Sequence, residues 1–178
     1  VWGHLWRLFP WAAAGVVCGY VTMGWLKDAE MKRLIGVIVL AMTGLHLWRQ
    51  WRRKETEVGV PPGGWFAATM GLLAGFTTMV ANAAGPVMIL YLLAMGLPKM
   101  EFLGTGAWYF LLLNVAKIPF SAHRGLITKE SLELDAVAAP LVLVSAWAGR
   151  YVAHRVNEKV FVGLALVFTV LAGLRLMW

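Results

Sequence analysis

The chain has 178 residues, of which 60% are hydrophobic and 14% are charged, and its mean hydropathy is +0.70. Soluble domains carry about 25% charged residues, so this composition excludes an ordinary soluble domain and indicates a polytopic helical membrane protein. The net charge of +7 comes from short basic clusters between apolar runs, such as residues 49–54. That pattern is typical of membrane flanks facing anionic lipid, so we expect a lipid bilayer and no nucleic acid as a partner.

Charged residues and helix breakers divide the chain into apolar segments. A basic linker containing proline and glycine, residues 51–64, follows the second segment. Several charge-free cores are shorter than the roughly 20 residues that a bilayer requires, and snorkelling arginines at their ends would supply the missing length. We therefore predict an all-α fold. The expected membrane segments are 10–26, 34–48, 65–81, 86–96, 102–122, 134–152 and 160–178.

The third and fourth segments belong to one charge-free stretch, residues 58–98, which is interrupted at Asn82-Ala83-Ala84-Gly85-Pro86. Pro86 has no amide hydrogen, and its ring disfavours helix at Gly85. Non-helical backbone at membrane depth is tolerated only where it packs within protein or lines a cavity. Because transporters bind their substrates at such broken helices, the interruption favours a membrane transporter.

An internal repeat is also predicted. Residues 10–19 align with residues 140–149 without a gap, and each segment carries a small-xxx-small pair that would let helices approach closely. These pairs are Gly15 with Gly19, and Ser145 with Gly149. Further along, Gly44 falls on Gly173 after a one-residue deletion. The alternative is chance recurrence of glycine and leucine in apolar helices.

The repeat predicts a duplicated protein in which residues 1–50 match residues 133–178. Residues 1–50 would then be the last two helices of a first, incomplete repeat. Residues 65–178 would form a complete second repeat opened by the broken helix. On this interpretation the chain is N-terminally truncated relative to the duplicated protein.

The residues from Gly71 to Thr78, followed by 82–86 and by 91–93, resemble the second repeat of the TauE/SafE family. These are sulfite and organosulfonate exporters, also called the toluene sulfonate uptake permease family. Residues 104–108 are similar to the GTSA element of that family, whereas the glycine-rich run usual at the break is replaced by Ala81-Asn82-Ala83-Ala84 before Gly-Pro. The resemblance implies duplicated four-helix repeats and transport of a small anion, such as sulfite or an organosulfonate, across the bacterial cytoplasmic membrane without a cofactor.

The break is the first candidate binding site. A half-helix that starts at Pro86 would present free amides and the positive end of its dipole, which is the physical basis of anion binding at helix starts. The residues that would add donors or shape this site are Thr77, Thr78, Asn82 and Gly85. The alternative is a proline kink whose polar groups pair with neighbouring helices.

Lys117 is the second candidate, because it lies within the apolar segment 102–122, one helical turn after Asn114. A charge inside a membrane segment is costly and indicates function by default, although a lysine near a segment end can also snorkel to the interface. The predicted substrate-binding residues are therefore Thr77, Thr78, Asn82, Gly85, Pro86, Asn114 and Lys117.

The sequence lacks the residue patterns that a metal site or an enzyme active site would need. The four histidines have no ligand spacing, so no metal site is predicted. No nucleophile elbow or phosphate loop is present, so an enzyme is not expected. The main alternative to a transporter is a non-transporting membrane assembly or scaffold protein, and a membrane enzyme is less favoured. The protein could form an oligomer under each of these interpretations.

Overall fold

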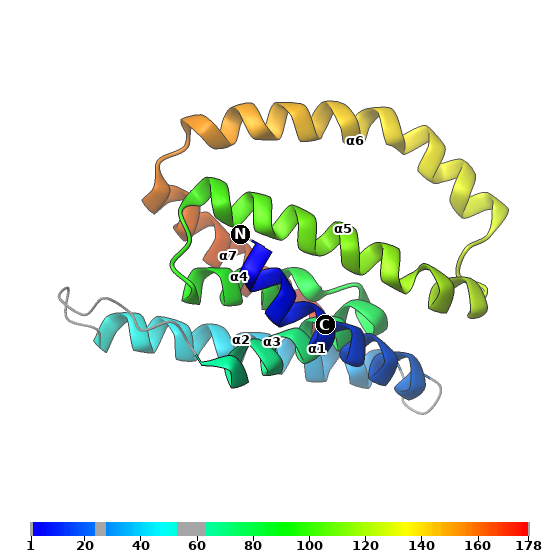
Figure 1. Cartoon of the computed structure of the whole chain (residues 1–178), viewed down its shortest axis with the longest axis horizontal. Coiled ribbons are helices and arrows are strands. Elements are labelled where there is room, and N and C mark those ends of the chain that lie inside the picture. The colour runs from blue at the N-terminus through cyan, green and yellow to red at the C-terminus, as the bar shows by residue number, and fades with distance from the viewer. Residues whose placement is uncertain (1, 24–27, 53–62, 178) are drawn as a thin grey trace.

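The computed structural model describes residues 2–23, 28–52 and 63–177, so most of the predicted basic linker lies outside the described residues. Over the described residues the chain is helical, as predicted, with seven helices and no strand (Figure 1). The helices are α1 (Trp2–Thr22), α2 (Asp28–Arg52), α3 (Gly64–Ala81), α4 (Ala84–Ala94), α5 (Lys99–His123), α6 (Lys129–Arg155) and α7 (Glu158–Met177).

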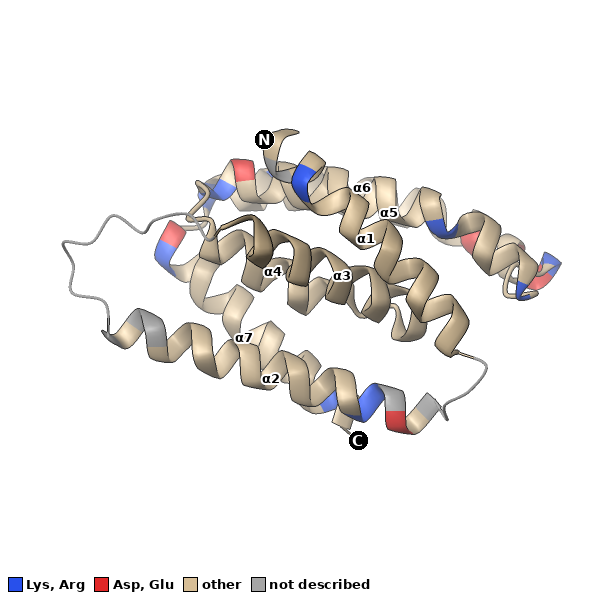
Figure 2. Cartoon of the chain, turned by 60° about the horizontal axis from the view of Figure 1, so that its bottom comes forward, with Lys and Arg blue, Asp and Glu red and all other residues tan. Residues whose placement is uncertain are grey.

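Among the described residues, α3, α6 and α7 are long and apolar enough to cross a membrane, judged by length and composition. They coincide with three of the predicted segments. α4 is a shorter apolar helix of 11 residues. Figure 2 shows that most charged residues gather near the ends of the helices, which leaves apolar surface along their middle. This distribution is the one expected of an integral membrane protein.

Helices α1 and α3 pack backbone against backbone through paired glycines. The glycines are Gly15 and Gly19 on α1, and Gly71 and Gly75 on α3. A Cβ at Gly15 would overlap the carbonyl oxygen of Leu72, and a Cβ at Gly75 would overlap that of Ala12. The first predicted small-xxx-small pair therefore lies at a close helix contact, where packing takes the place of a hydrophobic driving force.

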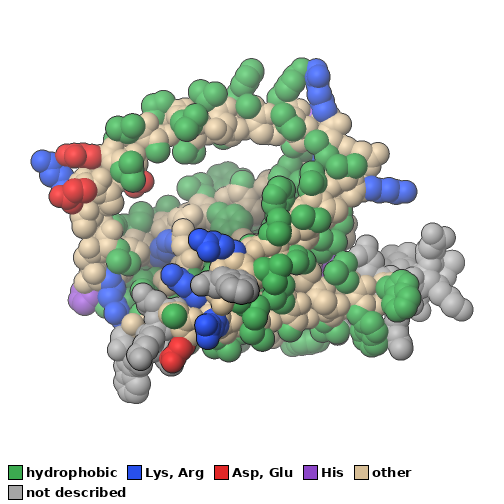
Figure 3. Space-filling view, turned by 180° about the vertical axis from the view of Figure 1, so that it is seen from behind, with side chains coloured by type: hydrophobic (Ala, Val, Ile, Leu, Met, Phe, Trp, Pro, Cys, Tyr) green, Lys and Arg blue, Asp and Glu red, His purple; other side chains and the backbone are tan. Residues whose placement is uncertain are grey.

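The close helix contact expected at Gly149, the counterpart of Gly19 in the predicted repeat, is not present among the described residues. A Cβ on Gly149 would meet nothing within 4 Å, and no residue of α6 is buried. Figures 1 and 3 show α6 arching apart from the other helices, with an opening beneath it in the space-filling view. The sequence pattern of the two helices is alike, but close packing requires a partner, and only α1 has one here. The duplicated architecture is not confirmed.

The broken segment is a helical hairpin. The ring of Phe66, near the start of α3, stacks on that of Tyr91, near the end of α4, with centroids 5.9 Å apart. The chain therefore runs along α3, turns at the break and returns along α4, as Figure 1 shows. α4 contacts α2, α3, α5 and α7, and most of its side chains are buried. The break thus directs a short helix into the centre of the fold.

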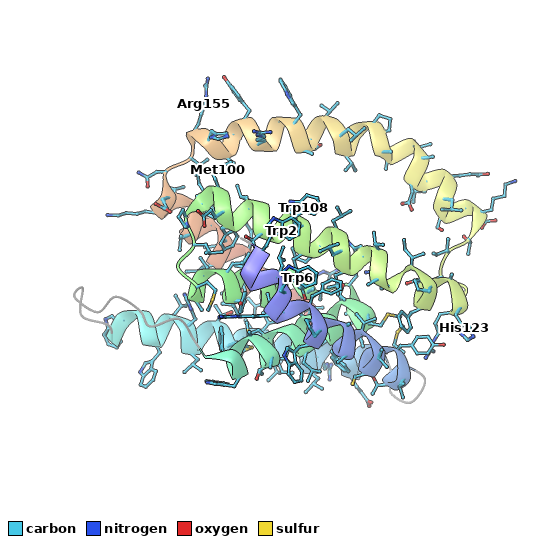
Figure 4. All side chains as sticks on the ribbon, in the orientation of Figure 1. Trp2, Trp6, Met100, Trp108, His123 and Arg155 are labelled. Atoms are coloured by element: carbon cyan, nitrogen blue, oxygen red, sulfur yellow. The ribbon has the colours of Figure 1, made fainter. Side chains whose placement is uncertain are left out.

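Helix α5 runs antiparallel to α4 and parallel to α1. Its Gly106 lies opposite Leu92 of α4, whereas Lys117 reaches Asn82 just before α4 begins. Trp108 contacts Trp2 at the start of α1, with ring centroids 5.2 Å apart, and Phe120 contacts Tyr20 near its end (Figure 4). The break therefore lies toward the C-terminal end of α5.

Candidate functional site

The break begins with a left-handed residue. Asn82 has φ +51° and ψ +34°, and it is the one non-glycine residue with positive φ in the described part of the chain. Asparagine tolerates this conformation better than most residues. The Asn82 amide donates to Thr78 O at 3.0 Å, and the Ala83 amide donates to Thr77 O at 3.1 Å. These two bonds satisfy the last carbonyls of α3 and turn the chain.

Helix α4 begins at Ala84, so the expectation that it starts at Pro86 is wrong by two residues. Proline is tolerated throughout a first turn because its missing amide would have no intrahelical acceptor there. The first-turn amides that α4 presents are therefore those of Ala84 and Gly85. The N-cap residue Ala83 provides no side-chain hydrogen bond to them, so this helix start has no side-chain cap.

Lys117 bridges α5 to the break. Its Nζ donates to Asn82 Oδ1 at 2.6 Å and lies 3.5 Å from Thr78 Oγ1. Both partners are neutral. The one salt bridge among the described residues joins Lys129 to Glu133 on exposed α6, so no carboxylate of this part of the chain neutralises Lys117. Lys117 is therefore a half-buried cation whose hydrogen-bond partners are both neutral, an arrangement that is costly within a membrane segment.

The other predicted residues differ in how close they lie to the cluster formed by Lys117, Asn82 and Thr78. Thr77 is buried beside Thr78, and its hydroxyl donates to Ala74 O at 3.2 Å within its own helix. Gly85 is half-buried with open space where a Cβ would lie, and Pro86 is buried. The structure thus brings Thr78, Asn82 and Lys117 together, next to the turn that contains Gly85.

Asn114 lies apart from the cluster. It is exposed, and the hydrogen bonds of Lys117 lead to α3 and the break instead. Three residues correspond to 300° of helix rotation, so Asn114 sits about 60° around α5 from Lys117. The buried side of α5, marked by Tyr109 and Leu113, lies on the other side of Lys117. Local spacing therefore did not identify the partner of the lysine.

A second polar cluster joins the ends of α1 and α5. Tyr20 Oη lies 2.7 Å from His123 Nδ1, and the Arg124 guanidinium lies over the Tyr20 ring at 4.6 Å from its centroid. Arg124 also donates to the backbone carbonyl of Tyr20. Figure 4 places His123 at the end of α5, beside the end of α1. This cluster, about 9 Å beyond Lys117 along the helix, was not predicted, because its partners are far apart in sequence.

The comparison with protein families agrees with the resemblance read from the sequence. The family described as "Sulfite exporter TauE/SafE" matches residues 1–176. No curated protein and no solved structure shows significant similarity to the chain. Among the described residues, no group of three or more His, Cys, Asp or Glu side chains could hold a metal ion. The chain therefore belongs to the TauE/SafE sulfite exporter family of membrane transporters.

Proposed function

We propose that this protein moves a small anion, sulfite or an organosulfonate, across the bacterial cytoplasmic membrane, and that the anion binds between Lys117 and the start of α4. The observation that carries this proposal is the pairing of Lys117. Its ammonium is half-buried, and its hydrogen bonds go to the neutral side chains of Asn82 and Thr78. A substrate anion supplies the missing negative charge.

Two sources of positive potential adjoin at this site. One is the ammonium of Lys117, and the other is the start of α4, where the amides of Ala84 and Gly85 lack intrahelical acceptors. Asn82, which binds the ammonium, precedes these amides by only two or three residues. A unit charge about 4 Å from an anion contributes roughly 4 kcal/mol at an effective dielectric constant near 20. The helix start adds backbone donors of the kind that bind sulfate and phosphate in other proteins.

Lys117 is held at the end of α3 by neutral groups, without an acidic side chain. Asn82 terminates α3, and the C-terminal end of a helix carries partial negative charge that favours a nearby cation. The Asn82 carbonyl oxygen and this helix end hold the ammonium in place without cancelling its charge. An arriving oxyanion accepts from the same ammonium and meets the adjacent amides, so the lysine exchanges a neutral partner for a charged one.

The proposal is tested by calorimetric titration of the purified protein in detergent with sulfite and with ethanesulfonate. Lys117→Gln removes the charge and keeps much of the side-chain length. A hydrogen bond to a charged group contributes about 1.5–3 kcal/mol, so we expect affinity to fall roughly 10- to 150-fold. Lys117→Arg should restore part of this loss, because the two cations differ in shape and hydration.

Lys129→Gln is the matched control, because Lys129 is an exposed lysine whose salt bridge to Glu133 lies on α6. It should bind both anions as the wild type does. Equal affinity in the wild type and in Lys117→Gln would remove Lys117 from the site. An inability of the wild type to bind or transport either anion would favour the non-transporting assembly protein instead.

A further inference from the structure

Tyr109, on the inward side of α5, carries a buried hydroxyl that the fold leaves unpaired. Its side chain is 0% exposed, and its Oη is the one buried side-chain nitrogen or oxygen atom without a hydrogen-bond partner in the described part of the chain. Buried polar groups are nearly always paired, and leaving one unpaired lowers stability. Phenylalanine would fill nearly the same volume without the stability lost to an unpaired hydroxyl. Packing alone therefore does not explain why this residue is a tyrosine.

The position of Tyr109 relates it to the site at the break. It precedes Lys117 by eight residues, which is about 12 Å along a helix axis, and so lies near the middle of the 25-residue α5. The buried face of α5 that carries Tyr109 and Gly106 packs toward α4, since a Cβ on Gly106 would lie 3.6 Å from Leu92 Cδ1. Tyr109 therefore shares the buried face of α5 that meets α4 at Gly106, and it is more deeply buried than Lys117.

Most side chains near this face are apolar, and the buried Thr105 lies on the same face, one turn before Tyr109. Met88 and Leu92 of α4 and Leu113 of α5 are buried members of the same core cluster as Tyr109. Leu113 is the residue of this face that lies between Tyr109 and Lys117. Going inward from Lys117 along the buried side of α5, the Tyr109 hydroxyl is thus the first polar side-chain group.

On the basis of the proposed function, we infer that the Tyr109 hydroxyl is a second contact for the transported oxyanion, used after the anion leaves Lys117. One sulfite ion cannot bridge about 12 Å of helix, so the two contacts act in succession. Conduction through a membrane protein requires binding steps that are favourable enough to enter and weak enough to leave. A single neutral O–H donor that no other group of the described residues engages meets this requirement.

The test compares Tyr109→Phe with the wild type in two assays: calorimetric sulfite binding in detergent, and sulfite flux into proteoliposomes. The variant keeps the ring and removes only the hydroxyl. We expect its thermal stability to be equal or higher, its equilibrium affinity to stay within about twofold, and its flux to fall at least tenfold. Tyr151→Phe, which removes a hydroxyl from exposed α6, is the matched control and should transport as the wild type does.

Each other outcome overturns the inference in a distinct way. Unchanged flux in Tyr109→Phe, together with lost binding in Lys117→Gln, would leave the proposed function standing and remove Tyr109 from the path. A loss of thermal stability would mean that the hydroxyl has a structural partner. A loss of equilibrium affinity as large as that of Lys117→Gln would place Tyr109 in the first site. Unchanged binding in Lys117→Gln would refute the proposed function itself.

Discussion

The close contact between α1 and α3 allows a sharp test with two glycine-to-alanine substitutions. In Gly75→Ala the new methyl group would overlap the backbone of Ala12, with the carbonyl oxygen, carbonyl carbon and Cα all within 3 Å. Backbone atoms cannot rotate away as a side chain can, so the two helices must separate. Overpacking of this kind costs about 1–3 kcal/mol, against a gain of about 0.8–1 kcal/mol in helix propensity.

Gly149→Ala makes the same chemical change in α6, where nothing lies within 4 Å of the added methyl group. It therefore gains the helix propensity without the overlap. For a chain of this size, 1 kcal/mol corresponds to about 2–4 °C in Tm. We expect Gly149→Ala to raise Tm by up to about 4 °C and Gly75→Ala to lower it by up to about 8 °C.

The measurement is thermal unfolding of both variants and of the wild type in one detergent, with intrinsic tryptophan fluorescence as the readout. A Gly75→Ala variant at least as stable as the wild type would refute the backbone-to-backbone packing of α1 on α3. A Gly149→Ala variant as unstable as Gly75→Ala would show that α6 is packed against another helix in the detergent-solubilised protein. The contrast between the two positions carries the prediction, because the chemical change is identical.

Two further predictions concern the ends of α3 and α5. Asn82→Ala should be less stable than Asn82→Gly by about 1 kcal/mol, because alanine is strained at positive φ and glycine is not; equal Tm values for the two variants would contradict the left-handed turn. Arg124→Gln removes the cation over the Tyr20 ring and the bond to its carbonyl, so it should lower stability by about 0.5–1 kcal/mol. The same readout checks it, with exposed Lys129→Gln as a comparison for the loss of one surface cation, and a Tm equal to that of the wild type would mean that the contact contributes nothing.

The location of the break could be predicted from the sequence, but its geometry could not. A charge-free stretch too long for one helix, interrupted at Gly85-Pro86, requires a change of direction in that region. Whether such a segment continues across the membrane or returns depends on tertiary contacts, here the stacking of Phe66 on Tyr91. The start of α4 at Ala84 was also hidden, because proline is compatible with several positions of a first turn.

In the candidate site, too, the local sequence predicted an important residue but not its partner from another part of the chain. Lys117 stood out because a cation within an apolar segment is costly. Its partner Asn82 lies 35 residues away on another element, whereas helical spacing favoured the neighbouring Asn114. Tyr109 left no signal at all, because an unpaired hydroxyl is a property of its surroundings and not of the residue type.

The hairpin formed by α3 and α4 also has a topological consequence. Since α4 returns toward the beginning of α3, we expect the connection between α4 and α5 to lie on the same side of the membrane as the start of α3. The turn between α6 and α7 lies beside the start of α5, because Lys99 contacts Val156 and Glu158, so we expect this turn on the same side as well. Residues 63, 97 and 157 should therefore be labelled by a membrane-impermeant reagent from one side, and residue 125 from the other.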